Sequence, residues 1–226
     1  LFLLYSRKVE DDMPKETSPG SEKANKEMDT PSIIDELTSL YNHRFLMDAI
    51  SLEFAKSQKQ GLALALILLN IDDFQTITND LGPAIGNKVL IEVAETIKNS
   101  TRDVDIVGRC GGEKFCVLLP NTHLKRATVG AERVRNLIIS RLFKEGQVSF
   151  NITVSLGISC ISEADTASAR DLLEHADMRL YADKQRGRNR VLYKKDTPEE
   201  TLSPTGPSIP ASPTPSHMQG ASVMQY

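Results

Sequence analysis

Apolar residues recur with two different periods between the polar ends of this 226-residue chain. The first pattern is helical: Asn42 is a suitable N-cap, apolar residues then recur on one face, and Gly61 marks the end. An unbroken apolar run at residues 62–69 is typical of a strand that is buried on both faces. Two further helical patterns follow, at residues 74–81 and 85–97.

The second half of the pattern predicts a hairpin, two helices and two more strands. Two short apolar segments, 104–108 and 115–119, flank a pair of glycines and predict a tight β-hairpin. The elements expected after it are a helix at 124–142, an alternating strand at 150–160, a helix at 169–185 and a strand at 190–193. Strands joined both by a hairpin and by helical crossovers predict an α+β domain, in which helices pack on a sheet.

Both ends of the chain have compositions that are typical of segments outside a folded core. Residues 1–32 are rich in charges of both signs and contain helix-breaking Pro and Gly, which predicts a charged linker. Residues 196–226 are rich in Pro, Ser and Thr and predict a disordered tail. Residues 33–195 remain as a single folded domain.

The first five residues, Leu1 to Tyr5, are apolar and are followed at once by Arg7 and Lys8. Two interpretations stay open. The run is either the cytoplasmic end of a truncated transmembrane helix or part of a linker with an arbitrary start. The domain itself is expected in the cytoplasm, and under the first interpretation it would be tethered to a membrane.

Composition excludes some classes of function. A net charge of -3 and a pI near 5.9 argue against a broad nucleic-acid surface, which is usually strongly basic. Cys110, Cys116 and Cys160 form no pair with metal-ligand spacing, and their odd number fits reduced thiols in the cytosol. The four histidines are scattered along the sequence, so no zinc site is expected.

The glycine pair of the predicted hairpin is the first candidate for chemistry. Gly111 and Gly112 have no side chains, so a ligand could approach the backbone closely. The carboxylate of Glu113, directly after them, is a suitable ligand for a metal ion. The alternative is that the two glycines only form a turn.

Six short motifs in a fixed order resemble the GGDEF family of diguanylate cyclases across the whole folded domain. They lie at residues 35–44, 70–74, 111–115, 131–133, 153–158 and 176–189. The resemblance implies a palm-like nucleotidyl-cyclase fold with a central, mostly antiparallel sheet flanked by helices. It also implies GTP and cyclic di-GMP as the ligands.

The same resemblance implies that the catalytic site is degenerate. In the family, two GTP-bearing domains face each other, and divalent metal ions assist the attack of each 3′-hydroxyl on the partner's α-phosphate. The metal-binding aspartate corresponds to Asn70, the retained hairpin carboxylate is Glu113, and the second acidic position is Lys114, which makes this a GGEKF variant. A bare ammonium at Lys114 would oppose the metal ions by several kcal/mol, on the order given by Coulomb energies at a dielectric near 20. No tightly bound cofactor is expected, with Glu113 a weak metal site and Mg²⁺ required only for residual cyclase activity.

The nucleotide-binding positions are partly kept. The resemblance places the guanine-binding positions on Thr78 and Asn87, and it places Gln75 and Pro83 where a Lys and a His are common. The expected nucleotide contacts are the backbone of the glycine pair, these two base positions and two basic residues: Gly111, Gly112, Thr78, Asn87, Lys184 and Arg188. Without the family context, the two basic residues would indicate an ordinary helix end with a favourable charge.

A second nucleotide site is implied by an Arg-x-x-Asp motif before the hairpin. Arg102 and Asp105 stand at the distance from the glycines at which many relatives have an inhibitory site for cyclic di-GMP, and Arg133 matches a further arginine of that site. An arginine fork recognises phosphate or the guanine edge, and a carboxylate accepts from the guanine N–H groups. The alternative is an ordinary surface ion pair.

Three functions are compatible with these observations. The favoured one is a catalytically degenerate domain that acts as a cyclic di-GMP receptor through Arg102, Asp105 and Arg133. The others are a weakly active diguanylate cyclase, which makes cyclic di-GMP and two pyrophosphates from two GTP molecules, and a GTP-sensing or protein-interaction module. A homodimer and an unknown protein effector are compatible with all three, and no nucleic-acid partner is expected.

Overall fold

The computed structural model describes residues 32–194 except residues 147 and 186. Residues 1–31 of the predicted linker, which include the apolar residues Leu1 to Tyr5, and the predicted tail from residue 196 onward lie outside these residues. None of the helices in the described part of the chain has the length and apolar character that are needed to cross a membrane.

The described residues form five helices and seven strands. In chain order they are α2 His43–Gln60, β1 Leu64–Ile71, α3 Phe74–Leu81, α4 Pro83–Asn99, β2 Ile106–Gly111, β3 Lys114–Pro120, α5 Leu124–Ile139, β4 Phe143–Glu145, β5 Val148–Phe150, β6 Val154–Cys160, α6 Ala169–Gln185 and β7 Val191–Leu192.

Five of the strands form one sheet in the order β2-β3-β1-β6-β7, and β4 and β5 form a separate small hairpin. Within the sheet, β2/β3, β3/β1 and β1/β6 are antiparallel pairs, and β6/β7 is a parallel pair. The predicted α+β architecture with a mostly antiparallel central sheet is therefore confirmed.

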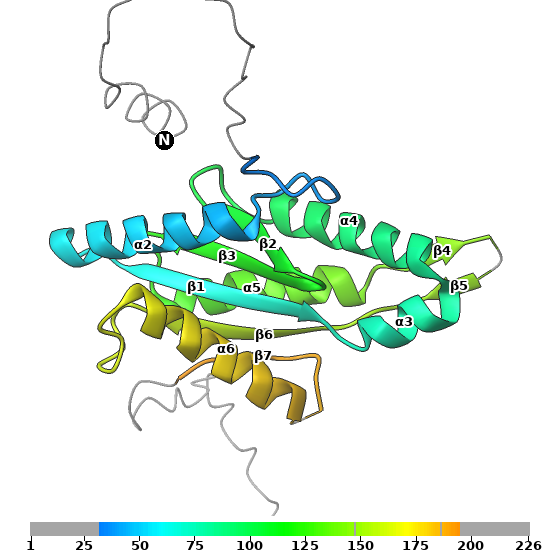
Figure 1. Cartoon of the computed structure of the whole chain (residues 1–226). Helices are drawn as coiled ribbons and strands as arrows, with labels where there is room; N and C mark the ends of the chain where they lie inside the picture. The colour runs from blue at the N-terminus through cyan, green and yellow to red at the C-terminus, as the bar shows by residue number, and fades with distance from the viewer. Residues whose placement is uncertain (1–31, 147, 186, 195–226) are drawn as a thin grey trace, which may run out of the picture.

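Helices cover both faces of the sheet (Figure 1). One apolar cluster joins a face of the sheet to α4 and α5, and the other joins the opposite face to α2 and α6. Strand β1 is central, and all eight of its residues are buried. Its unbroken apolar run is thus explained by burial on both faces.

The structure corrects several expected boundaries. The strand predicted at 62–69 runs from Leu64 to Ile71, because Asn70 pairs with Lys114 of β3 and with Ser155 of β6 despite its polar side chain. The helix predicted at 124–142 ends at Ile139. The strand predicted at 150–160 is divided between β5 and β6, because its first residue belongs to the small β4–β5 hairpin.

Helix α6 lies unusually close to β6, and Gly157 makes this possible. A Cβ atom at Gly157 would lie 2.1 Å from the carbonyl oxygen of Ala176 and 2.5 Å from the nitrogen of Leu180. Because Gly157 has no side chain, α6 can pack directly against β6. This packing brings the end of α6 to the turn after β1.

Candidate functional site

The β2–β3 hairpin presents its glycine backbone to solvent. Gly111 and Gly112 have φ angles of 130° and 53°, and a Cβ atom at either position would meet nothing within 4 Å. Arg109 holds the hairpin from one side: its Nε and Nη2 donate to the carbonyl oxygen of Gly112 at 2.9 and 2.7 Å, and its Nη1 lies 3.3 Å from Asp35. The tip is thus open to a ligand and fixed by one arginine.

The structure brings two of the expected metal positions into contact. The side-chain nitrogen of Asn70 donates to Glu113 Oε1 at 3.2 Å, and Asn70 Oδ1 is buried with no hydrogen-bond partner among the described residues. The amide therefore turns an N–H donor toward the one carboxylate, whereas a magnesium ion needs oxygen ligands. This pair of side chains does not fit a divalent metal ion.

Lys114 has a partner that the sequence did not reveal. Its ammonium lies 2.6 Å from Asp177 Oδ1 on α6, and the two side chains are 37% and 54% exposed. Lys114 is the first residue of β3 and lies opposite Asn70 of β1, on the face of the sheet that packs against α2 and α6. The expectation of a bare ammonium in the metal pocket is corrected, because Asp177 compensates the charge on the helix side of the hairpin.

The turn after β1 is held by a buried carboxylate. Asp72 accepts hydrogen bonds from the hydroxyls of Thr153 and Ser155, both at 2.7 Å, and from the backbone N–H of Asn189 at 3.2 Å. These contacts bring the segment after α6 to the turn that follows Asn70. Asp72 was not among the predicted site residues, although the motif at residues 70–74 contained it.

Asp73 and Asp183 lie near the residues that are predicted to contact phosphate. Arg188 Nη2 lies 3.4 Å from Asp73, which adopts a left-handed backbone with φ 51°. Asp183 on α6 is fully buried, and burial raises the pKa of its carboxyl group although Arg190 Nε lies 3.4 Å away. The expected phosphate-binding Arg188 is thus near the turn after β1. Lys184 is half-buried near the end of the same helix.

The predicted base-reading residues lie on α3 and α4. The hydroxyl of Thr78 donates to the backbone oxygens of Phe74 and Gln75, so it already has partners within its own helix. Its methyl group occupies the space that a side chain at Gly86 would need, at 2.4 Å. Asn87, the next residue, is exposed. Of the two base positions, only Asn87 has a side chain that is open to a ligand.

Arg102 and Asp105 of the Arg-x-x-Asp motif line a cavity of about 330 Å³ between the sheet, α4 and α5. Arg102 Nη2 lies 2.7 Å from Asp105 Oδ1, its Nε lies 3.2 Å from Oδ2, and its Nη2 also donates to Thr122 at 2.8 Å. The hydrogen bond to Asp105 raises the pKa of Arg102. Arg102 is 53% exposed, whereas Asp105 is almost fully buried, so the pair presents a positive charge to solvent.

The third predicted residue lines the same cavity. Arg133 on α5 donates to the backbone oxygen of Ser100, in the segment that leads to Arg102. Arg126, seven residues earlier on α5, is also part of the lining. Sequence reasoning missed Arg126, although a spacing of seven residues places two side chains on one face of a helix. The cavity therefore joins three arginines and one aspartate.

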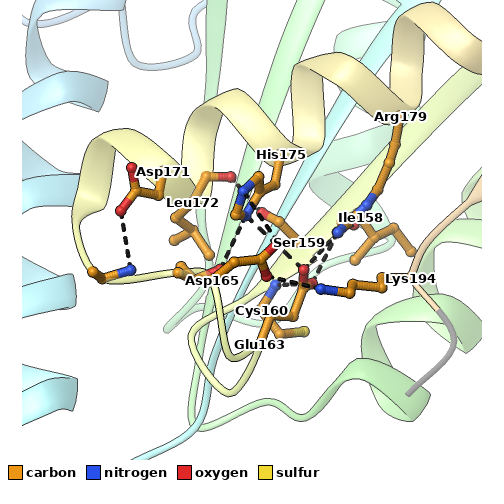
Figure 2. A network of polar contacts seen from close by, with 12 residues as sticks. Ile158, Ser159, Cys160, Glu163, Asp165, Asp171, Leu172, His175, Arg179 and Lys194 are labelled. Atoms are coloured by element: carbon orange, nitrogen blue, oxygen red, sulfur yellow. Dashed lines mark hydrogen bonds and ion pairs between the residues drawn. The ribbon is translucent and has the colours of Figure 1, made fainter. Parts of the chain in front are cut away.

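A separate polar cluster fixes the start of α6 (Figure 2). Glu163 is fully buried and is paired with Arg179 through contacts of 2.5 and 2.8 Å. His175 lies 4.0 Å from Glu163 and 3.9 Å from Asp165, and Lys194 lies 2.9 Å from Asp165. The ligand atoms of Glu163, Asp165 and His175 all lie within 4.8 Å of one another. Because Arg179 and Lys194 already neutralise the two acids, the cluster is a structural clamp.

The fold and the hairpin define a class of protein. A central antiparallel sheet covered by helices, with a glycine hairpin beside the turn after the central strand, is the arrangement of a nucleotidyl-cyclase domain. The chain belongs to the GGDEF family: the family model described as "Diguanylate cyclase, GGDEF domain" matches residues 32–190.

Two curated relatives show the extent of the similarity. Diguanylate cyclase A of Treponema denticola is 36% identical over 171 residues, which cover 75% of this chain and 46% of that protein. The response regulator PleD of Caulobacter vibrioides is 34% identical over 166 residues, which cover 72% of this chain and 36% of that protein. The chain thus spans less than half the length of these relatives.

Solved structures of the family share the fold. The GGDEF domain of DgcB from Caulobacter crescentus, in complex with c-di-GMP, has a TM-score of 0.67 and 28% identity, and covers 77% of this chain and 97% of that chain. The diguanylate cyclase SiaD from Pseudomonas aeruginosa, in complex with its activator SiaC, has a TM-score of 0.69 and 27% identity, and covers 85% and 68%.

Proposed function

We propose that this domain is a cyclic di-GMP receptor whose former cyclase site is silent. The observation that carries the proposal is the cavity at which Arg102, Asp105 and Arg133 meet, although Arg133 is distant from the other two in sequence. That a solved relative, the GGDEF domain of DgcB, is in complex with c-di-GMP supports the choice of ligand.

The chemistry of the cavity suits a cyclic dinucleotide. Cyclic di-GMP has two phosphates and two guanines, and the guanidinium group of an arginine can donate two hydrogen bonds to either kind of group. Arg102 is the most direct candidate for contact with the ligand, because about half of its side chain is exposed while the guanidinium group is paired with Asp105. Arg133 and Arg126 supply further positive charge from α5. We expect the carboxylate of Asp105 to accept from guanine once Arg102 moves toward a phosphate.

The donor set at the hairpin supports a silent cyclase site. Asn70 directs an N–H group at Glu113, and the next position on the hairpin, Lys114, supplies no carboxylate and is paired with Asp177. One carboxylate with an amide donor 3.2 Å away is a poor site for Mg²⁺, and the cyclase reaction depends on metal ions to stabilise charge on the triphosphate. GTP could still be held near Arg188 without turnover.

Calorimetry with cyclic di-GMP tests the receptor role. We expect the native chain to bind, and the Arg102→Ala variant to bind at least about tenfold more weakly, because a charge-assisted hydrogen bond contributes about 1.5–3 kcal/mol. Arg170→Ala is the matched control: Arg170 is an exposed arginine on α6 whose partner is Glu174, and its loss should leave binding unchanged. No binding at about tens of micromolar ligand, or native-like binding by Arg102→Ala, would refute the proposal.

The magnesium dependence of GTP binding tests the silent site. We expect the native chain to bind GTP equally with and without Mg²⁺, because its side chains offer the metal one carboxylate. The Asn70→Asp/Lys114→Glu variant has two more acidic ligands, and we expect Mg²⁺ to increase its affinity for GTP by about tenfold. Each single variant serves as a control for the other position.

The remaining functions are outcomes of the same experiments. Magnesium-dependent formation of cyclic di-GMP by the native chain at about 1 s⁻¹ or faster, the range of ordinary enzymes, would identify an active cyclase instead. GTP binding without any cyclic di-GMP binding would favour a GTP-sensing or protein-interaction module. A homodimer is compatible with each outcome, since a ligand with two guanines can bridge two domains.

A further inference from the structure

Cys110 and Cys116 are neighbours on the face of the β2–β3 hairpin that α2 and α6 cover. Cys116 of β3 lies opposite Gly108 of β2, and Cys110 stands two residues further along β2, where the register shifts. Cys116 belongs to the apolar cluster on that face, and Cys110 packs against the cluster. The register thus places the two side chains on neighbouring strands and against the same apolar cluster, and both thiols are free. This arrangement comes from the fold, independently of the nucleotide positions.

The two thiols differ in their access to solvent. Cys116 is 0% exposed, whereas Cys110 is partly exposed and lines a cavity of about 470 Å³ against α2 and α6. His43, Met47 and Met178 line the same cavity. Cys110 is therefore the more accessible thiol of the pair, whereas Cys116 is enclosed in the apolar cluster.

The surroundings of the two thiols shift their pKa values in opposite directions. The interaction with Cys116 lowers the pKa of Cys110 most strongly, and the ammonium of Lys114 acts in the same direction, against the effects of burial and of the carboxylate of Asp177. The hydrogen bond to Cys110, together with burial, raises the pKa of Cys116 well above its usual range. Cys110 is thus the better thiolate, which is the form that reacts with oxidants, and Cys116 gives up its proton only as it attacks the oxidised Cys110.

We propose that Cys110 is an oxidation site and that Cys116 is its resolving partner, so that hydrogen peroxide closes a disulfide across the hairpin. In the first step the Cys110 thiolate attacks one peroxide oxygen: an S–O bond forms, the O–O bond breaks and hydroxide leaves. In the second step the sulfur of Cys116 attacks the sulfenic sulfur, an S–S bond forms, and the hydroxyl group leaves with the thiol proton as water. The two sulfurs together lose two electrons, which peroxide accepts.

The position of the pair predicts that the bridge is reversible. Residues that are diagonal across adjacent strands are further apart than directly opposite ones, so a bridge between them must pull the strands from their relaxed spacing. Strained disulfides have higher reduction potentials and are reduced readily by dithiols. The hairpin with Glu113 and Lys114 would then change its conformation with the redox state of the two sulfurs.

Mass spectrometry of the full 226-residue chain tests the proposal with hydrogen peroxide as the probe. In the reduced native protein, iodoacetamide should label Cys110 at least about tenfold faster than the buried Cys116 and Cys160, since only an accessible thiolate reacts. After peroxide, a non-reducing digest should contain a Cys110–Cys116 link, two hydrogens lighter than the reduced peptides. Dithiothreitol should remove it.

Variants assign the steps. In Cys116→Ala, peroxide should leave a sulfenic acid on Cys110 that dimedone traps, whereas Cys110→Ala should show no link and no adduct. Cys160→Ala, the matched control on β6, should behave like the native chain. Equal labelling of all three cysteines in the folded protein, or oxidation of Cys110 without any link to Cys116, would overturn the proposal. The labelling and the link are measured on the native chain, so they do not depend on whether a variant folds.

Discussion

Replacement of Gly157 by alanine is expected to destabilise the domain by at least about 3 kcal/mol, at the upper end of the cost of overpacking. The new methyl group would lie 2.1 Å from the oxygen of Ala176, 2.5 Å from the nitrogen of Leu180 and 3.1 Å from its Cα. All three atoms belong to the backbone of α6, so no side chain can rotate away. The helix would have to leave the sheet, and its contacts with β6 and β1 would be lost.

Urea denaturation followed by circular dichroism measures this effect. Gly130→Ala is the matched control, because Gly130 lies within α5 and a Cβ atom there would meet nothing within 4 Å. Alanine is the better helix former by about 0.5–1 kcal/mol, so the control should be neutral or slightly more stable. A Gly157→Ala protein within about 1 kcal/mol of the native stability would show that α6 does not depend on this close approach.

Removal of the arginine from the buried Glu163–Arg179 pair should have a comparable effect. In Arg179→Met, the carboxylate of Glu163 remains fully buried without the partner that contacts both of its oxygens. Loss of one partner of a buried ion pair costs about 3–5 kcal/mol, mainly because the remaining charge is uncompensated. The same urea titration would measure the loss, which should appear as a lower midpoint with an unchanged slope.

A second substitution separates lost charge compensation from lost packing. Glu163→Gln in the Arg179→Met background removes the unpaired charge and keeps an acceptor for the backbone N–H of Cys160, which lies 2.9 Å from Glu163. We expect the double variant to recover much of the lost stability. Arg170→Met, in an exposed ion pair with Glu174, should be indistinguishable from the native chain. A double variant no more stable than Arg179→Met would assign the effect to packing.

Periodicity predicted the central elements well and the edges less well. The run before Asn70 identified β1 because a strand that is buried on both faces has to be apolar throughout, and Asn42 identified the start of α2 because its side chain accepts from the N–H of Phe45 at 3.1 Å. The β4–β5 hairpin escaped prediction, since strands of three residues are too short for a periodic signal. The strand predicted at 62–69 stops before Asn70, whereas pairing on both sides extends β1 through Asn70 to Ile71.

The sequence by itself determined the family, the sheet with its covering helices and the chemical identity of the hairpin residues, because these depend on local patterns and residue types. Only the tertiary structure decided that Lys114 is paired with Asp177, that Arg126 joins Arg102 and Arg133 at one cavity, and that Cys110 and Cys116 pack against the same cluster on neighbouring strands. The physical reason is that a side chain's partner depends on its direction and on contacts between segments far apart in the chain. Neither is contained in the spacing of residues along one segment.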